Sequence, residues 1–123
     1  MSGPRPTQLT LHQASHILEI AFDDGSGYRL PCEYLRVESP SAEVKGHGGQ
    51  RQTVAGKRGL KIARLEPVGN YAVRIVFDDL HDSGIYSWDY LHQLGAEQAE
   101  RWAAYEAELA AKGLSRDPPR RRH

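Results

Sequence analysis

Two segments of this chain read alike, and this likeness constrains the fold more than any other feature of the sequence. Residues 18–24 (LEIAFDD) align with residues 73–79 (VRIVFDD). After five further residues in the first copy and six in the second, residues 30–36 (LPCEYLR) align with residues 86–92 (YSWDYLH). We interpret the chain as two copies of one unit, although two unrelated hairpins made of common strand residues would read similarly.

Each copy has the pattern of a strand, an acidic turn, a second strand and a short helical turn. In the second copy Tyr71, Val73, Ile75 and Phe77 occupy alternate positions, which predicts a strand with these side chains on one face. Residues 66–70 (EPVGN) predict the turn that precedes this strand.

The two short helices carry end signals. Pro31 suits the first position of the first helix, Ser87 suits the N-cap of the second, and Gly95 is placed to end it. The predicted fold is therefore a small α+β domain, mainly antiparallel β, built from two strand-turn-strand-short-helix units and followed by a C-terminal α-helix.

Residues 95–112 predict that C-terminal helix. They are rich in alanine and hold two Glu-to-Arg or Glu-to-Lys pairs four residues apart, and Gly113 follows as a stop. One narrow apolar stripe is expected to pack on the sheet, with docking on a partner chain as the alternative; it consists of Trp102, Tyr105 and Leu109. Flexible tails are expected at residues 1–8 and, with a basic end, at 113–123, leaving the domain itself at 9–94.

Composition excludes several classes of protein. The 123 residues suit one domain, and 16 Lys+Arg balance 16 Asp+Glu to a net charge of +0, so no overall field attracts nucleic acid or membrane. The single cysteine, Cys32, forms neither an internal disulfide nor a CxxC pair. No apolar stretch approaches the roughly 20 residues of a membrane span. We expect a cytoplasmic protein without a membrane partner.

A glycine-rich basic segment forms the one asymmetric patch. Six Lys/Arg and no acid lie between residues 45 and 64. This is not a P-loop, because Arg51 stands at the first glycine position and Arg58 at the hydroxyl position. A solvated loop is the first interpretation. Anion or nucleic-acid contact is the alternative, through Lys45, Arg51, Lys57, Arg58 and Lys61.

The residues that could carry catalysis have structural interpretations. Cys32 precedes the acidic Glu33 and aligns with Trp88, which predicts a buried structural cysteine. The acidic pairs at 23–24 and 78–79 are expected to serve turns. The six histidines lack the spacing of metal ligands. We therefore expect no catalytic residue, no cofactor and no enzymatic activity.

Two blocks of the sequence resemble bacterial stand-alone members of the gamma-butyrobetaine hydroxylase-like N-terminal domain family. The first block is residues 30–44, continued at 46–48; the second comprises 62–65, 66–71 and 77–91. The resemblance covers about residues 8–94. It implies a small α+β domain dominated by antiparallel strands.

The resemblance also implies a degenerate zinc site. In the carnitine-pathway dioxygenases this domain precedes a separate iron and 2-oxoglutarate catalytic domain and binds a structural zinc through three cysteines and one histidine. Ser39, Ser41 and Val44 stand in the cysteine positions here, while His81 matches the histidine. One imidazole and two neutral hydroxyls would hold zinc weakly, so we expect no tight zinc.

An accessory role follows from the same resemblance, because related domains are fused to Mrp-type P-loop ATPases of iron-sulfur cluster assembly. The first hypothesis is a non-catalytic binding or adaptor module for an unidentified protein partner. Its candidate surface comprises His81, Tyr86, Trp88, Ser39 and Glu43, together with the basic loop. The second hypothesis is anion, nucleotide or nucleic-acid contact through the basic segment. An enzyme would gain support only from an exposed Cys32 thiol of low pKa.

Overall fold

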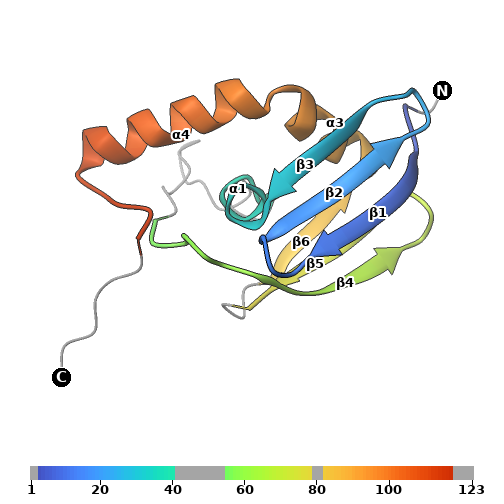
Figure 1. Cartoon of the computed structure of the whole chain (residues 1–123), viewed down its shortest axis with the longest axis horizontal. Coiled ribbons are helices and arrows are strands. Elements are labelled where there is room, and N and C mark those ends of the chain that lie inside the picture. Colours follow the sequence, from blue (N-terminus) through green and yellow to red (C-terminus); the bar gives the residue numbers. More distant parts are fainter. Residues whose placement is uncertain (1–2, 41–54, 79–81, 118–123) are drawn as a thin grey trace.

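The computed structural model describes residues 3–40, 55–78 and 82–117, without the side chains of residues 82 and 83. Within these ranges the chain forms two three-stranded antiparallel sheets, with three helices beside them (Figure 1). In chain order the elements are β1 (Pro6–His12), β2 (Ile17–Phe22), β3 (Gly27–Pro31), α1 (Cys32–Val37), β4 (Ile62–Val68), β5 (Ala72–Phe77), β6 (Asp82–Ser87), α3 (Trp88–Ala96) and α4 (Gln98–Lys112).

The two sheets confirm that the chain is built from two similar units. Their strand orders are β1-β2-β3 and β4-β5-β6, and a helix follows the third strand in each. The register of the first pair of strands shifts at the same place in both, between Pro6 and Gln8 and between Ile62 and Arg64. Each unit is one strand longer than the sequence predicted, because β1 and β4 belong to the repeat as well.

One apolar core lies between the sheets and holds the two units together. Two buried tyrosines cross between the units: the Tyr34 hydroxyl donates to the carbonyl of Leu94 at 2.6 Å, and the Tyr86 hydroxyl to that of Leu35 at 2.5 Å. Apolar side chains from both sheets surround them. The buried cluster comprises Leu18, Ile20, Phe22, Leu30, Cys32, Tyr34, Leu35, Leu60, Ile62, Val73, Ile75, Phe77, Tyr86, Leu91 and Leu94.

The C-terminal helix predicted at 95–112 is confirmed as α4, although Gly95 does not end the short helix before it. Helix α3 continues to Ala96 and α4 begins at Gln98. Gly95 lies inside α3, where a Cβ would overlap the ring of Tyr28. The glycine therefore serves close packing of α3 on β3. The N-cap prediction for Ser87 is confirmed, while Pro31 is the N-cap of α1 and not its first residue.

Helix α4 packs on α1 and not on a sheet, which corrects the prediction for its apolar stripe. Tyr105 and Leu109 are buried against Val37 of α1, and Trp102 lies edge-on to Tyr34 with ring centroids 6.2 Å apart. In Figure 1, α4 runs above α1 and extends past the sheets. Tyr105 and Leu109 are thus covered within the chain and do not dock on a partner, whereas Trp102 is partly buried.

Parts of both predicted tails are fixed. Residues 6–8 belong to β1. After α4, which ends at Gly113 with φ 68° as predicted, the chain returns to the segment before β4. There the carbonyls of Ser115 and Arg116 accept hydrogen bonds from the amides of Gly56 (2.9 Å) and Arg58 (2.8 Å). The prediction of a flexible tail is therefore wrong for 113–117. The predicted turn at 66–70 is likewise too long, since β4 continues to Val68.

Candidate functional site

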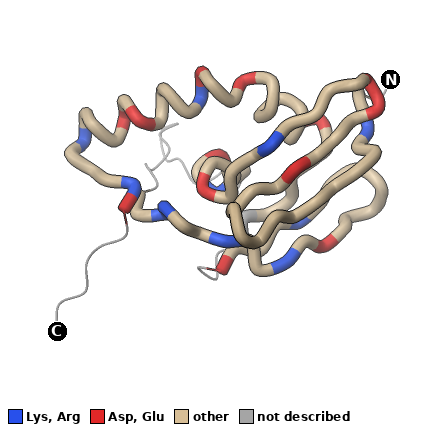
Figure 2. Tube along the Cα trace, viewed as in Figure 1, with Lys and Arg blue, Asp and Glu red and all other residues tan. Residues whose placement is uncertain are grey.

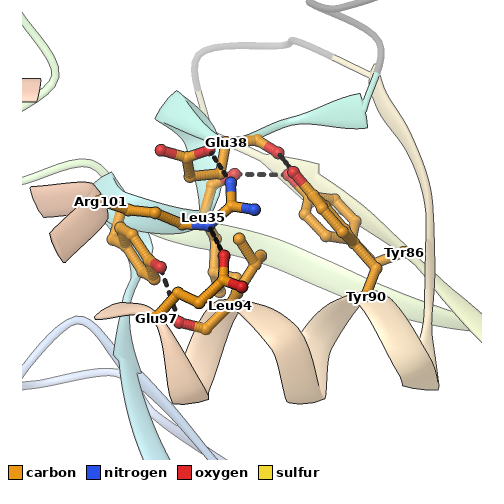
Figure 3. A network of polar contacts seen from close by, with 8 residues as sticks. Leu35, Glu38, Tyr86, Tyr90, Leu94, Glu97 and Arg101 are labelled. Carbon is orange, nitrogen blue, oxygen red and sulfur yellow. Dashed lines mark hydrogen bonds and ion pairs between the residues drawn. The ribbon is translucent and has the colours of Figure 1, made fainter. Parts of the chain in front are cut away.

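Two glutamates at α1 are buried, and each is held by an arginine from the C-terminal part of the chain. Glu33 accepts two hydrogen bonds from Arg116, at 2.8 and 2.9 Å. Glu38 accepts one from Arg101 at 2.8 Å, and Figure 3 shows Arg101 reaching between Glu38 and Glu97. A buried carboxylate is costly without such a partner. These pairs fasten α4 and the segment after it to α1, which is a structural role.

Ser26, Asp24 and His92 form a small polar cluster at the β2–β3 turn. Nε2 of His92 lies 2.9 Å from the Asp24 carboxylate and 3.3 Å from the Ser26 hydroxyl. A nucleophilic serine needs the hydroxyl and the carboxylate on opposite nitrogens of the imidazole. Here both contact the same nitrogen, and the Ser26 hydroxyl donates to Asp24 at 2.5 Å. The cluster stabilises the turn, as predicted for this acidic pair.

Cys32 has the structural role predicted for it. Its side chain is 1% exposed, and burial raises the pKa of the thiol to about 11. Nucleophilic cysteines are accessible and have a lowered thiol pKa. The feature that would have favoured an enzyme is therefore not found at Cys32.

In the basic segment, backbone amides and a cationic side chain make contacts within the chain. Lys45 and Arg51 lie outside the described residues. The amides of Gly56 and Arg58 donate to carbonyls after α4 and so do not face an anion, and the Arg58 guanidinium pairs with Asp117. Figure 2 shows both signs of charge where the chain after α4 meets the segment before β4. Lys57 and Lys61 are the other predicted cations within the described ranges.

The predicted partner surface is only partly a surface. Tyr86 and Ser39 are each 0% exposed, so neither side chain can meet a partner and this part of the prediction is corrected. Tyr86 faces inward because its residue position in β6 places it opposite Val73 in the core. Trp88 is partly buried at the edge of the core. Glu43 and His81 lie outside the described residues, as do Ser41 and Val44 of the predicted zinc site. In the described ranges no three His, Cys, Asp or Glu side chains are grouped to hold a metal ion.

Trp88 lines a pocket that the sequence did not predict. The pocket lies between the β4–β5 turn, the first residues of α3 and the N-terminal segment before β1. Tyr71, from the turn, is 58% exposed beside it. We call this feature the aromatic pocket; its volume is about 220 Å³, and it is lined by Gly3, Pro4, Arg5, Asn70, Tyr71, Ser87, Trp88 and Asp89.

Local sequence sets the walls of the aromatic pocket. Gly69 has φ 54°, a conformation that favours glycine, and a Cβ there would lie 3.1 Å from ring carbons of Tyr71. The next carbonyl, of Asn70, accepts the indole N–H of Trp88 at 3.0 Å. Ser87 caps the first turn of α3, which begins at Trp88. The turn and the helix start therefore hold both aromatic rings at one end of the sheet.

The equivalent position of the first unit is closed. The amide of Cys32 donates to the His16 carbonyl at 2.9 Å, as the amide of Trp88 donates to the Tyr71 carbonyl at 3.1 Å. Cys32 thus corresponds to Trp88, and His16 to Tyr71. Because the same backbone arrangement forms around a small buried cysteine, the fold does not require an aromatic pair there. The pair is accordingly the strongest candidate for function in the described part of the chain.

Residues 9–92, which carry both units, match the family described as gamma-butyrobetaine hydroxylase-like, N-terminal. The chain belongs to this family. The matched region therefore includes both sheets, apart from the first three residues of β1, and the first five of the nine residues of α3, while α4 follows it. A comparison with curated proteins found no match.

Solved structures share this domain and extend the likeness. Two solution NMR structures are 44% and 42% identical; they cover 98% and 99% of this chain and 95% of each of their own, with TM-scores of 0.84 and 0.81. A crystal structure of a protein of unknown function from Acidithiobacillus ferrooxidans, of the DUF971 family, is 38% identical over 78% of this chain and 100% of its own, with a TM-score of 0.66. This gamma-butyrobetaine hydroxylase-like N-terminal domain is thus a domain of unknown function.

Sequence reasoning missed most of the aromatic pocket. The alternation of apolar residues predicts that Tyr71 belongs to the strand, but β5 begins one residue later, at Ala72. The sequence predicts a tail for Pro4 and Arg5. One signal could have found the site: where the two copies align, the second has Tyr71 and Trp88, and the first has smaller or more polar residues.

None of the described helices is long and apolar enough to span a membrane.

Proposed function

We propose that this chain is a non-catalytic protein-binding domain that binds its partner at the aromatic pocket. The observation that carries the proposal is the aromatic pair: the exposed Tyr71 and the partly buried Trp88 flank one hollow, although the equivalent position of the first unit needs only a buried cysteine. Tyrosine and tryptophan are the residues most enriched where protein interfaces derive their binding energy.

The other clusters support the proposal by having structural roles already. Cys32 is buried, the Ser26 cluster holds a turn, and the buried ion pairs of Glu33 and Glu38 hold α4. The family resemblance points to a partner in iron-sulfur cluster assembly or to a dioxygenase, for which this domain would be an accessory.

Affinity capture with a matched pair of variants tests the proposal. Tyr71→Ser removes the exposed ring, and Leu114→Ser removes another exposed apolar side chain that does not line the pocket. We expect full-length protein to capture one stable protein partner from lysate of its source cells. Tyr71→Ser should lower recovery about tenfold or more, and Leu114→Ser should leave it unchanged.

Nuclease treatment of the lysate distinguishes binding of nucleic acid from binding of a protein partner. Recovery that disappears after nuclease treatment and in Lys57→Glu, while Tyr71→Ser has no effect, would replace the protein partner with nucleic acid. Equal losses in Tyr71→Ser and Leu114→Ser would show that general surface hydrophobicity, and not the aromatic pocket, retains the captured protein.

A further inference from the structure

The N-terminal segment of the chain forms one wall of the aromatic pocket. Gly3, Pro4 and Arg5 line it together with the two aromatic residues. The backbone of Arg5 is anchored on the far side, because its amide donates to the Asp23 carboxylate at 3.1 Å and its carbonyl accepts the Asp23 amide at 2.8 Å. Pro4 is therefore held at a fixed place between β1 and the start of α3.

This segment lies close to the exposed side chain of Asp89 at the start of α3. A Cβ on Gly3 would overlap a carboxylate oxygen of Asp89, in the first turn of α3. The fold thus places the Gly-Pro-Arg segment beside Tyr71 and Trp88. An occupant of the pocket would therefore contact Pro4 as well as the two aromatic rings.

We infer that the aromatic pocket binds a proline-containing segment of the partner in an extended conformation, beside the chain's own Pro4. This inference rests on the proposed function and names its partner's chemistry. Aromatic side chains that line a groove are the usual receptors of polyproline-type segments, whose ordering entropy is low and whose proline residues bring no N–H group to be left unpaired.

The polar groups of the pocket agree with an apolar anchor. The indole N–H of Trp88, its one donor, is already bonded to the Asn70 carbonyl at 3.0 Å. Trp88 therefore offers a ring surface and no donor for an anion. The charged side chains that line the pocket are one of each sign, Arg5 and Asp89, so an occupant needs no net charge.

The size of the pocket sets the length of the anchor. About 220 Å³ is several times the share of one water molecule, about 30 Å³. The pocket is smaller than the roughly 300–1,000 Å³ of pockets that bind drug-sized ligands. One or two residues of a segment fit, whereas a large cofactor does not.

NMR titration of the full-length, ¹⁵N-labelled chain tests the inference with defined peptides. The probe is acetyl-Gly-Pro-Arg-Pro-amide, the sequence of residues 3–6, and the control is acetyl-Gly-Ala-Arg-Ala-amide. We expect a saturable shift of the Trp88 indole N–H with the proline peptide, about tenfold weaker affinity for the alanine peptide, and no shift of the Trp102 indole. Because no net charge is required, affinity should change little between low and physiological salt.

Three results would overturn the inference. One is no saturable shift with the proline peptide, and another is equal affinity for the two peptides. The third is a Trp88 shift that depends on protein concentration without peptide, which would make a second copy of the chain the occupant. Tyr71→Ser should weaken peptide binding about tenfold while the Trp102 indole keeps its position, which shows that the variant is folded.

The outcomes distinguish this inference from the proposed function. Partner capture that depends on Tyr71, without proline-peptide binding, would leave the protein-binding proposal in place and refute the proline chemistry. Peptide binding without a captured protein would support the pocket's chemistry and refute the proposed partner in that lysate.

Discussion

Gly95 shows how a single residue position can be set by a distant ring. It lies in α3 against Tyr28 of β3, and Tyr28 in turn lies edge-on to Phe22 and His92, with ring centroids 6.2 and 5.6 Å away. The Tyr28 ring therefore cannot move aside without disturbing two further rings. Nothing in the local sequence distinguishes such a packing glycine from one that ends a helix.

We predict that Gly95→Ala destabilises the protein by about 1–3 kcal/mol, although alanine is the better helix former by about 1 kcal/mol. The added Cβ would overlap the Tyr28 ring. Urea unfolding measures the effect. Gly27→Ala is the control, since its Cβ would come no closer than 3.8 Å to a neighbour, the Ile20 carbonyl oxygen. Unchanged stability of Gly95→Ala would show that the Tyr28 ring has room to yield.

The Asp24 carboxylate, again a single residue, predicts how the stability of the protein depends on pH. The Ser26 hydroxyl and amide donate to its carboxylate and hold the pKa of Asp24 at about 2, below the ordinary value of 3.8. Its contribution to stability is present above pH 3.8 and is lost as the pH falls through about 2. Carboxyl NMR titration of Asp24 should show this value, and Ser26→Ala should raise it toward 3.8. A pKa near 3.8 in the unmutated protein would contradict the turn geometry.

At the scale of elements, the strands were predictable because their signals are local. The alternation of apolar residues and the two copies of the acidic turn place β2, β3, β5 and β6 from sequence alone. The boundary between α3 and α4 is predicted at Gly95 but lies at Glu97, because residues on both sides of Glu97 favour helix. The packing partner of α4 was not predictable, because its apolar stripe fits either a sheet or another helix equally well.

The segment after α4 makes a prediction about how that helix is held. Arg116 forms two hydrogen bonds with Glu33, whose side chain is 7% exposed, and its guanidinium lies 5.0 Å from the Trp102 ring. Arg116→Ala should destabilise the protein by about 3–5 kcal/mol, because it leaves a buried carboxylate without a partner. Urea unfolding, followed by tryptophan fluorescence, measures this.

A surface ion pair provides the matched control. Lys112 pairs with Glu108 at 3.3 Å with both side chains about half exposed, so Lys112→Ala should cost no more than about 0.5 kcal/mol. Adding Glu33→Gln to Arg116→Ala should recover part of the loss, since the buried group is then neutral. Equal effects of Arg116→Ala and Lys112→Ala would mean that Glu33 is hydrated after all.

At the scale of the whole molecule, the sequence repeat predicted two units but not what joins them. The joining contacts connect residues far apart in the chain, such as Arg116 with Glu33, 83 positions away, and Tyr34 with Leu94, 60 positions away. Long-range pairs of this kind leave no periodicity or spacing to read. The aromatic pocket has the same origin, because it brings together the chain's first residues, the β4–β5 turn and the start of α3.

The shared core predicts that the two units unfold as one. Tyr34 of the first unit donates to the Leu94 carbonyl of the second at 2.6 Å, and both residues are fully or almost fully buried. Tyr34→Phe leaves that carbonyl without its donor and should cost about 1–3 kcal/mol. Tyr71→Phe, at an exposed ring, should stay within about 0.5 kcal/mol of the unmutated protein.

In each protein the far-ultraviolet circular dichroism and the tryptophan fluorescence should follow one unfolding transition, because neither sheet keeps a closed core without the other. Two separate transitions, or an unaffected Tyr34→Phe, would mean that each unit is stable by itself and that the tyrosine bridges only align them.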